Sequence, residues 1–443
     1  MGSSFPREAR PGRPGVAASG QGMMVLVEDD RVTQSLVRRS AAVLRLGSLL
    51  LGAGAGSYRV KDSMRRAAEA LDLHEHRAQV TLTEITTTAR DGDHVRTEVI
   101  EQRDVGVNAD RIDAIAGVVE RLGPRTDVAA LESALDDVER APRHYGPVAS
   151  VLAVALACAA FAFLNNGGPI VCSAVLLAAG LGQTVRRRLQ HARLNKFAVT
   201  ALAAAVSSTL YVGVVLGLES LDFADTSHEA GLVSAVLYLV PGFPLVTAVL
   251  DFVRMDLSAG LTRLAYVTVT LLSAGMSVWA VSWLAGLELD GPASAVLDGP
   301  LLLVMRVVAS AVAAAGFAML FNSSPKAVAV AALIGGIANP ARIYLVESGV
   351  APQAASLVAA CVVGLLAALA ASRGRPSRVT LSVPAVVIMV PGVMVYRSLV
   401  HLNEGEVSAA LANGVEASFV IMGIGVGLAV SRMLTDRNWA FER

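Results

Sequence analysis

The chain has 443 residues, of which 54% are hydrophobic and only 17% are charged, and its formal net charge is zero. Soluble domains carry nearer a quarter of charged residues, so this composition excludes an ordinary soluble globular protein. The balanced charge does not favour nucleic-acid binding, and the three cysteines lie in apolar runs without disulfide or metal spacing. We therefore expect an integral membrane protein with no metal and no cofactor.

The first 145 residues resemble soluble protein. Residues 1–30 begin with a Gly-, Pro- and Ser-rich stretch and are expected to form a disordered tail. Residues 31–145 predict a small cytoplasmic α+β domain, with helices over 31–55, from Ser57, over 108–122 and over 126–140, and a β-hairpin that turns at residues 91–93.

The N-terminal segment carries no recognisable chemistry. It contains no nucleophile–base pattern, Walker loop or metal-ligand spacing, so an enzyme or an ATP-driven pump is disfavoured. The adjacent His74, Glu75 and His76 are expected to lie on a solvated face.

From about Pro147 onward, one apolar run follows another, each long enough to cross a bilayer as a helix. We count ten spans: 147–164, 169–185, 197–217, 231–253, 261–286, 301–321, 326–346, 353–371, 379–400 and 407–432. The loops after even-numbered spans carry Lys and Arg, as in "RRRLQHARLNK", whereas the loops after spans 3, 5, 7 and 9 carry neither. Because positive loops stay in the cytoplasm, both termini are expected to be cytoplasmic, in a multi-pass protein of the cell (inner) membrane.

The membrane part contains an internal repeat. The stretch from Phe161 aligns without gaps with the stretch from Phe317, an offset of 317 − 161 = 156. "VPGFPLVTAVLDF" from Val240 aligns with "VPGVMVYRSLVHL" from Val390, an offset of 150. Residues 146–290 (spans 1–5) would thus repeat as residues 291–435 (spans 6–10). Since five is odd, the second unit crosses the membrane in the opposite direction.

The expected fold is therefore a mainly α polytopic membrane protein of about ten helices, arranged as two inverted five-helix repeats with the small α+β domain in front. Inverted repeats are typical of secondary transporters, which bind their substrate near mid-membrane where helices are interrupted in both halves.

Proline and glycine interrupt spans 4 and 9 at matching positions. A broken helix exposes N–H groups that bind a carboxylate and carbonyl groups that hold an ammonium. The alternative is a simple proline kink, and for the paired asparagine turns a helical-hairpin turn. The candidate substrate-binding residues are Pro241, Gly242, Pro244, Pro391, Gly392, Asn166, Asn322 and Asn413.

Four ionisable residues lie within predicted spans, where charge is costly and usually functional. Asp251 and Glu416 are candidate proton carriers, and Glu416 is the deepest of the four. Arg306 and Arg397 are their candidate partners. The alternative for Asp251, Arg306 and Arg397 is that they snorkel to the membrane surface.

At this point the sequence resembles the threonine/serine exporter family. The resemblance rests on "LLLGAGAGSYRVKDSMRRAAEALDL", on "LVPGFPLVTAVLDFVRMDLSAGLTRL" and on "MVPGVMVYRSL", and it covers nearly the whole chain beyond the first 30 or so residues. It places Pro241, Gly242, Pro244, Leu245, Asp251, Gly260 and Arg263 on the family pattern. The resemblance implies export of threonine and serine from the cytoplasm, driven by the proton gradient.

Three alternatives stay open. Relatives with split halves are associated with dicarboxylate export, so small dicarboxylates are the second substrate class. A small-solute channel and a membrane-embedded enzyme are the other two, although no nucleophile–base pair supports an enzyme. The expected partners are a small amino acid, protons and membrane lipid, without nucleic acid; a homo-oligomer is compatible with the sequence.

Overall fold

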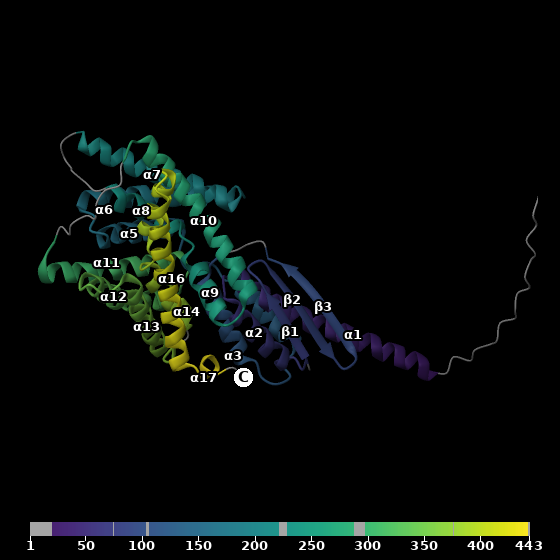
Figure 1. Ribbon diagram of the computed structural model, residues 1–443. Helices are drawn as coiled ribbons and strands as arrows, with labels where there is room; N and C mark the ends of the chain where they lie inside the picture. Colours follow the sequence, from purple (N-terminus) through teal and green to yellow (C-terminus); the bar gives the residue numbers. More distant parts are fainter. Residues whose placement is uncertain are drawn as a thin grey trace, which may run out of the picture.

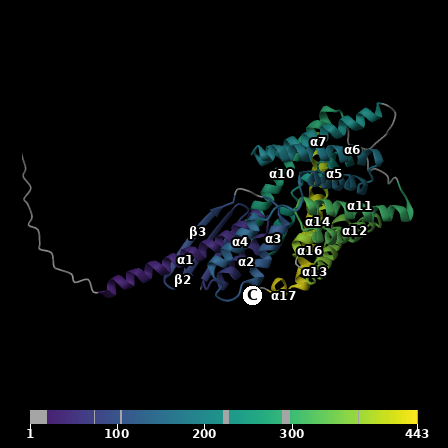
Figure 2. The ribbon, with the colours of Figure 1, turned by 180° about the vertical axis from the view of Figure 1, so that it is seen from behind.

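The computed structural model describes residues 20–73, 75–102, 106–220, 228–287, 297–374 and 376–441, with side chains undescribed at residues 20–33, 219, 228 and 438. The N-terminal domain lies at one end of a helical bundle (Figures 1 and 2). It consists of α1 (Gly20–Gly52), α2 (Ser57–Ala70), β1 (Glu75–Val80), β2 (Glu84–Asp91), β3 (His94–Glu101), α3 (Ala109–Arg121) and α4 (Val128–Arg140).

The domain is an antiparallel sheet of order β1-β2-β3 packed against α1 and α2. The predicted hairpin is β2–β3, which pairs Asp91 with His94 around Gly92, whose φ is +58°. Strand β2 buries Ile85, Thr87 and Ala89 at every second position, as expected for a strand with one covered face.

Two details of the domain differ from the sequence prediction. Helix α1 begins at Gly20, inside the predicted tail, because residues 23–30 contain neither glycine nor proline to end it. Strand β1 was not predicted, and its His76 does not lie on a solvated face. The His76 Nε2 lies 2.7 Å from the Thr87 hydroxyl, and burial lowers the pKa of His76. His74 lies outside the described residues.

Eight helices of the described chain are long and apolar enough to cross a membrane. They are α5 (Pro147–Leu164), α6 (Pro169–His191), α7 (Lys196–Glu219), α10 (Leu257–Leu284), α11 (Gly299–Leu320), α12 (Pro325–Glu347), α13 (Pro352–Ala371) and α16 (Val407–Thr435). The ten predicted spans correspond to these eight helices and two bent helix pairs, provided that each pair makes one crossing.

The bent pairs are predicted spans 4 and 9. The first consists of α8 (His228–Val236), the short 3₁₀ helix η1 (Leu237–Leu239) and α9 (Gly242–Val253), with a bend of 73°. The second consists of α14 (Arg378–Val387) and α15 (Gly392–Asn403), with a bend of 50°. A four-residue helix, α17 (Arg437–Ala440), follows α16.

Both bends are made by the same turn. Pro241 has φ −78° and ψ 61°, and Pro391 has φ −81° and ψ 64°. Gly242 N donates to Val240 O at 2.8 Å, and Gly392 N donates to Val390 O at 2.9 Å. These angles and bonds define an inverse γ-turn around each proline. The helices are therefore interrupted rather than kinked, because a residue in this conformation is not helical and proline has no N–H to continue the helix.

Other corresponding positions also share their geometry. Asn166 and Asn322, at an offset of 322 − 166 = 156, both adopt a positive φ, of 64° and 57° respectively, in the turns before α6 and α12. Helices α10 and α16 begin 407 − 257 = 150 residues apart. Sequence positions that align therefore carry the same local backbone.

Candidate functional site

The two Pro-Gly breaks lie against each other in the centre of the bundle. Gly242, the first residue of α9, packs so closely on Val387 at the end of α14 that a β-carbon would overlap it. In the reciprocal contact, a β-carbon at Gly392 would lie 3.0 Å from Val233 of α8. Each break thus packs against the partner pair's opposite segment, and a side chain at either glycine would crowd a valine side chain of that segment.

Little space remains beside the breaks. An apolar cavity of about 60 Å³ lies between α8, α10, α15 and α16, and is lined among others by Val236, Val240, Gly392 and Tyr396. Ligand pockets in proteins usually measure roughly 300–1,000 Å³. The helices around the breaks must therefore part before a solute of amino-acid size fits between them.

The breaks divide each bent pair into two segments. We call α9 and α14 the domain-proximal segments, because both contact the N-terminal domain, and α8 and α15 the distal segments. One ion pair lies on the domain-proximal side of the breaks and another on the distal side.

A buried ion pair lies on the domain-proximal side of the breaks. Asp251 of α9 lies 2.9 Å (Oδ2 to Nε) from Arg263 of α10, and the two residues are 2% and 1% exposed. The N-terminal domain completes this cluster. Ser57 N, at the start of α2, donates to Asp251 Oδ1 at 3.0 Å, and Arg263 Nη2 donates to Ala55 O at 2.8 Å. Asp251 therefore does not snorkel to a surface. Its buried carboxylate pairs with Arg263 and accepts a hydrogen bond from the N-terminus of α2.

The second domain-proximal segment is held in the reciprocal way. Asp113 of α3, in the N-terminal domain, accepts hydrogen bonds from Ser377 N at 2.9 Å and from the Thr380 hydroxyl at 3.0 Å, at the N-terminus of α14. Burial has the largest effect on the pKa of the Asp113 carboxyl, and it raises that pKa. The N-terminal domain thus binds α9 through the N-terminus of α2 and caps the N-terminus of α14 with the carboxylate of Asp113.

A second ion pair lies on the distal side of the breaks. Arg397 of α15 donates from Nε and Nη2 to the two oxygens of Glu229 on α8, at 2.6 and 2.8 Å. Glu229 is 4% exposed, in the first turn of α8, where its charge is favoured by the helix dipole. Sequence analysis missed Glu229 because the apolar run of span 4 starts at residue 231; its signal is an acidic residue directly before a broken span.

The structure pairs the predicted ionisable residues differently from our expectation. The predicted partners Arg306 and Arg397 form their ion pairs with other residues and not with Asp251 or Glu416. Arg306 of α11 donates to both oxygens of Glu347 at the end of α12, at 2.9 and 2.6 Å. Glu416 lies on the exposed face of α16, so it is not buried among helices as its depth in the span suggested.

The predicted asparagines do not meet at the breaks. Asn322 donates from Nδ2 to Asn108 Oδ1 of the N-terminal domain, and it accepts from His144 N, both at 2.9 Å. Since His144 lies just before α5 and Asn166 just after it, the two asparagines lie at opposite ends of a helix about 27 Å long. Asn413 donates to Ala409 O of its own helix at 2.9 Å. Pro244 is buried in the first turn of α9 and does not interrupt it.

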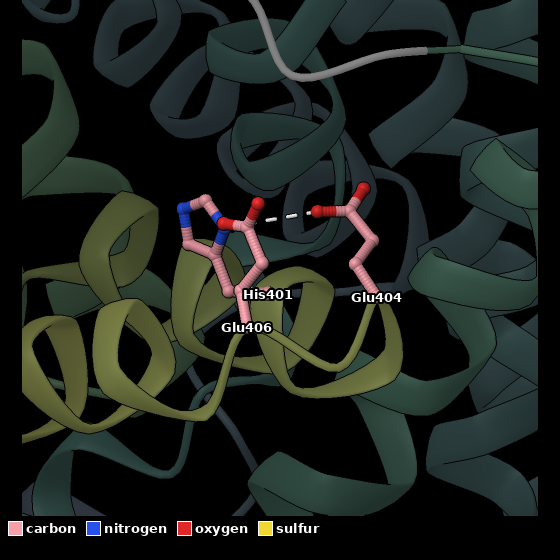
Figure 3. A group of neighbouring side chains, drawn as sticks. All are labelled: His401, Glu404 and Glu406. Carbon is pink, nitrogen blue, oxygen red and sulfur yellow. Dashed lines mark ion pairs between the residues drawn. The ribbon is translucent and has the colours of Figure 1, made fainter.

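One cluster of the described residues has the composition of a metal site. At the turn between α15 and α16, His401 Nδ1 lies 3.0 Å from a Glu406 oxygen and 3.7 Å from a Glu404 oxygen (Figure 3). One imidazole and two carboxylates are ligands suited to Zn²⁺. Glu404 and Glu406 are exposed, and such a group is as readily explained by ordinary surface ion pairs.

The comparisons with known proteins match the chain in two parts. A family model for threonine/serine exporters, ThrE, matches residues 41–284, which is 244 of the 443 residues. A second model, "Threonine/Serine exporter, ThrE", matches residues 306–434. The chain belongs to the threonine/serine exporter family. The first match ends with α10 and the second begins within α11, so the family boundary separates the two predicted repeats.

Individual relatives fall into two groups. The "Threonine/serine exporter" of Corynebacterium glutamicum is 24% identical over 407 residues, 88% of this chain and 82% of the relative. The "Probable threonine/serine exporter" of Mycobacterium tuberculosis is 23% identical over 409 residues, 89% of this chain and 75% of the relative. The "Probable succinate transporter subunit YjjP" of Escherichia coli K12 is 30% identical over 241 residues, 53% of this chain and 90% of the relative. No solved structure matches the chain.

Proposed function

We propose that this member of the threonine/serine exporter family is a proton-coupled secondary transporter that exports small amino acids, threonine and serine among them, by alternating access. The observation that carries the proposal is the reciprocal packing of two identical inverse γ-turns, one in each half of the chain. Matched interruptions of this kind mark the substrate site in secondary transporters built from inverted repeats. The candidate binding residues are therefore Pro241, Gly242, Pro391 and Gly392.

The orientation in the membrane is part of the proposal. The Arg-rich C-terminal end of α6, with the turn that follows it, carries the positive charge typical of the cytoplasmic side, and the same rule would place the N-terminal domain in the cytoplasm. The domain-proximal ion pair would then close the path from the cytoplasm, and the distal pair would close the path to the outside.

Asp251 is the proposed coupling residue. Protonation of its carboxyl would remove the negative charge that faces Arg263 and would weaken the acceptor of the Ser57 N–H bond. Both changes loosen the N-terminal domain from α9, so proton uptake would favour opening on the domain-proximal side. Glu416 stays a second candidate, with its carboxylate on the outer face of α16.

The test is counterflow of labelled threonine into proteoliposomes under an imposed pH gradient. We expect accumulation that follows the gradient and disappears when a protonophore collapses it. Protein-free liposomes give the background. Exchange that ignores the gradient would reject proton coupling, and absence of threonine exchange would reject the amino-acid substrate.

A second candidate substrate class is small dicarboxylates, because a relative that matches 53% of this chain is named "Probable succinate transporter subunit YjjP". Labelled succinate in the same vesicles separates the two classes. A channel, in contrast, would conduct down the solute gradient without accumulation.

A further inference from the structure

The distal ion pair contains an arginine that already holds a carboxylate in the geometry a solute would need. Arg397 donates hydrogen bonds from Nε and Nη2 to the two carboxylate oxygens of Glu229, at 2.6 and 2.8 Å. Two parallel bonds of this type are the strongest and most specific way in which a protein binds a carboxylate. The side chain of Arg397 is 31% exposed, whereas that of its partner Glu229 is 4% exposed.

Arg397 lies on the helix that begins at the second break. It lies 397 − 392 = 5 residues after Gly392, which is about 8 Å along α15. Its neighbours Val395 and Tyr396 line the apolar cavity beside the breaks, together with Val233, one turn after Glu229. The Tyr396 hydroxyl is fixed by a bond to Ser282 Oγ at 3.0 Å, so this wall is ordered.

The other buried arginines are less suited to this role. Arg263 is 1% exposed and is bonded to both a carboxylate and the Ala55 carbonyl of the N-terminal domain. Arg306 donates to both oxygens of Glu347 at the end of α12 and does not line the cavity beside the breaks. Arg397 combines a partly exposed side chain with a bidentate geometry, and it lies on the helix whose Val395 and Tyr396 line the cavity.

We propose that Arg397 binds the carboxylate of the transported solute and that Glu229 is its internal substitute, which occupies the guanidinium while no solute is bound. A solute carboxylate that displaces Glu229 separates α8 from α15 and opens the distal side; when the solute leaves, Glu229 returns and closes it. The inference rests on the proposed transport function and adds the chemical class of the ligand. Amino acids and dicarboxylates share a carboxylate, so one site serves both substrate classes.

Ligand-dependent thermal unfolding of the purified full chain tests the proposal, with threonine, serine, succinate and threoninol as probes. Threoninol keeps the ammonium and the side chain of threonine but lacks the carboxylate. We expect stabilisation by threonine or succinate and none by threoninol. Replacing Arg397→Gln should weaken carboxylate binding at least about tenfold, because one partner of a charged pair is lost. Glu229→Gln should tighten binding several-fold, because the internal competitor is weakened.

The charge-swapped variant Glu229→Arg/Arg397→Glu separates binding from folding. It retains an ion pair between α8 and α15, and so it should fold, but the guanidinium now projects from the other helix and carboxylate binding should be lost. Arg38→Gln is the matched control, because Arg38 makes a similar two-bond pair with Glu132 on the surface of the N-terminal domain. Its binding should equal that of the unmodified protein.

The outcomes distinguish this inference from the proposed function. Carboxylate binding of normal strength in the swapped variant, or equal binding of threoninol and threonine, overturns the role of Arg397 even if threonine is transported. Binding of succinate alone, lost in the swapped variant, supports Arg397 and rejects the amino-acid substrate.

Discussion

Charged side chains of the bundle are held in ion pairs between different helices and in bonds to the N-terminal domain. Asp251 meets Arg263 and the N-terminus of α2, and Arg397 meets Glu229 from the other bent pair. A carboxylate or guanidinium away from water is tolerated only when its partners are supplied, so these side chains fix the arrangement of the elements that carry them. Two predictions follow at the scale of single residues.

Replacing Asp251→Asn should destabilise the protein and abolish gradient-driven flux. The amide oxygen still accepts from Ser57 N, but Arg263 loses its counter-charge while it stays buried. Removal of one partner of a buried ion pair costs about 3–5 kcal/mol. Thermal unfolding and threonine counterflow measure the two effects. Adding Arg263→Gln should restore part of the stability without restoring flux. In the exposed-site control Glu416→Gln, unfolding should be unchanged; a normal unfolding temperature for Asp251→Asn would contradict the prediction.

Asp113 should make stability depend on pH. Burial raises the pKa of this carboxyl above its ordinary value of 3.8, so the folded chain binds the proton more tightly than the unfolded chain. Its stabilising contribution is therefore complete below about pH 3.8 and is lost as the pH rises through the raised pKa. Asp113→Asn removes this titration. The difference in unfolding free energy, unmodified minus variant, should fall as the pH rises through that window; a constant difference would refute the assignment.

At the scale of elements, the interrupted helices are the main feature of the fold. In the inverse γ-turn at each proline, the N–H of the following glycine donates to the carbonyl of the valine before the proline, where the helical hydrogen-bond pattern stops. The glycine also allows the partner pair to approach. The turn and the close approach are separate properties. Replacing the prolines tests the turn, and replacing the glycines tests the close approach.

Replacing Gly242→Ala should disturb the contact between α9 and α14 more than Gly392→Ala disturbs the contact between α15 and α8. The new methyl group overlaps Val387 in the first variant, whereas it lies 3.0 Å from Val233 in the second. Overpacking of this kind typically costs about 1–3 kcal/mol. Thermal unfolding of the two variants gives the comparison. Val387→Ala combined with Gly242→Ala should recover stability, and failure of this rescue would show that the close approach is not the cause.

Replacing Pro241→Ala should weaken transport while the protein remains folded. Alanine supplies an N–H and favours helix, so the break between η1 and α9 tends to close into a continuous helix. Initial rates of threonine counterflow, compared with those of Pro391→Ala, measure the effect. Unaltered kinetics in both variants would mean that the prolines shape the bundle but not the transport path.

At the scale of the whole molecule, the N-terminal domain holds both halves of the bundle together. It binds the first half through Ser57 and Asp251, and the second half through Asp113 with Ser377 and through Asn108 with Asn322. Its buried apolar residues form one continuous core with those of the bundle. Movement of the domain-proximal segments is therefore linked to movement of the domain.

The chain should tolerate division between its halves. Residues 1–287 and 297–443, produced together as separate chains, should assemble and purify as a complex, because the contacts between them do not need a covalent link. Co-purification through a tag on one fragment measures assembly. Asn322→Ala with Asp113→Ala should reduce it, whereas Glu416→Gln should not. Equal recovery with the double variant would show that the domain contributes little to holding the halves.

The sequence by itself determined the local and periodic features of the protein. The lengths of the hydrophobic runs predicted the positions of the spans, and proline and glycine predicted the two interruptions. The turn residues before α6 and α12 predicted the helical hairpins. Each of these features depends on residues that are close together in the chain. The predicted inversion, binding residues and proton carriers stay predictions. Only the tertiary structure decided which charges meet. Asp251 and Arg263 are 12 residues apart and Glu229 and Arg397 are 168 residues apart, and no periodic pattern links either pair. Partner choice is set by how the bent pairs pack across the breaks and by the seating of the N-terminal domain, since a buried charge is stable only where folding brings its counter-charge within reach.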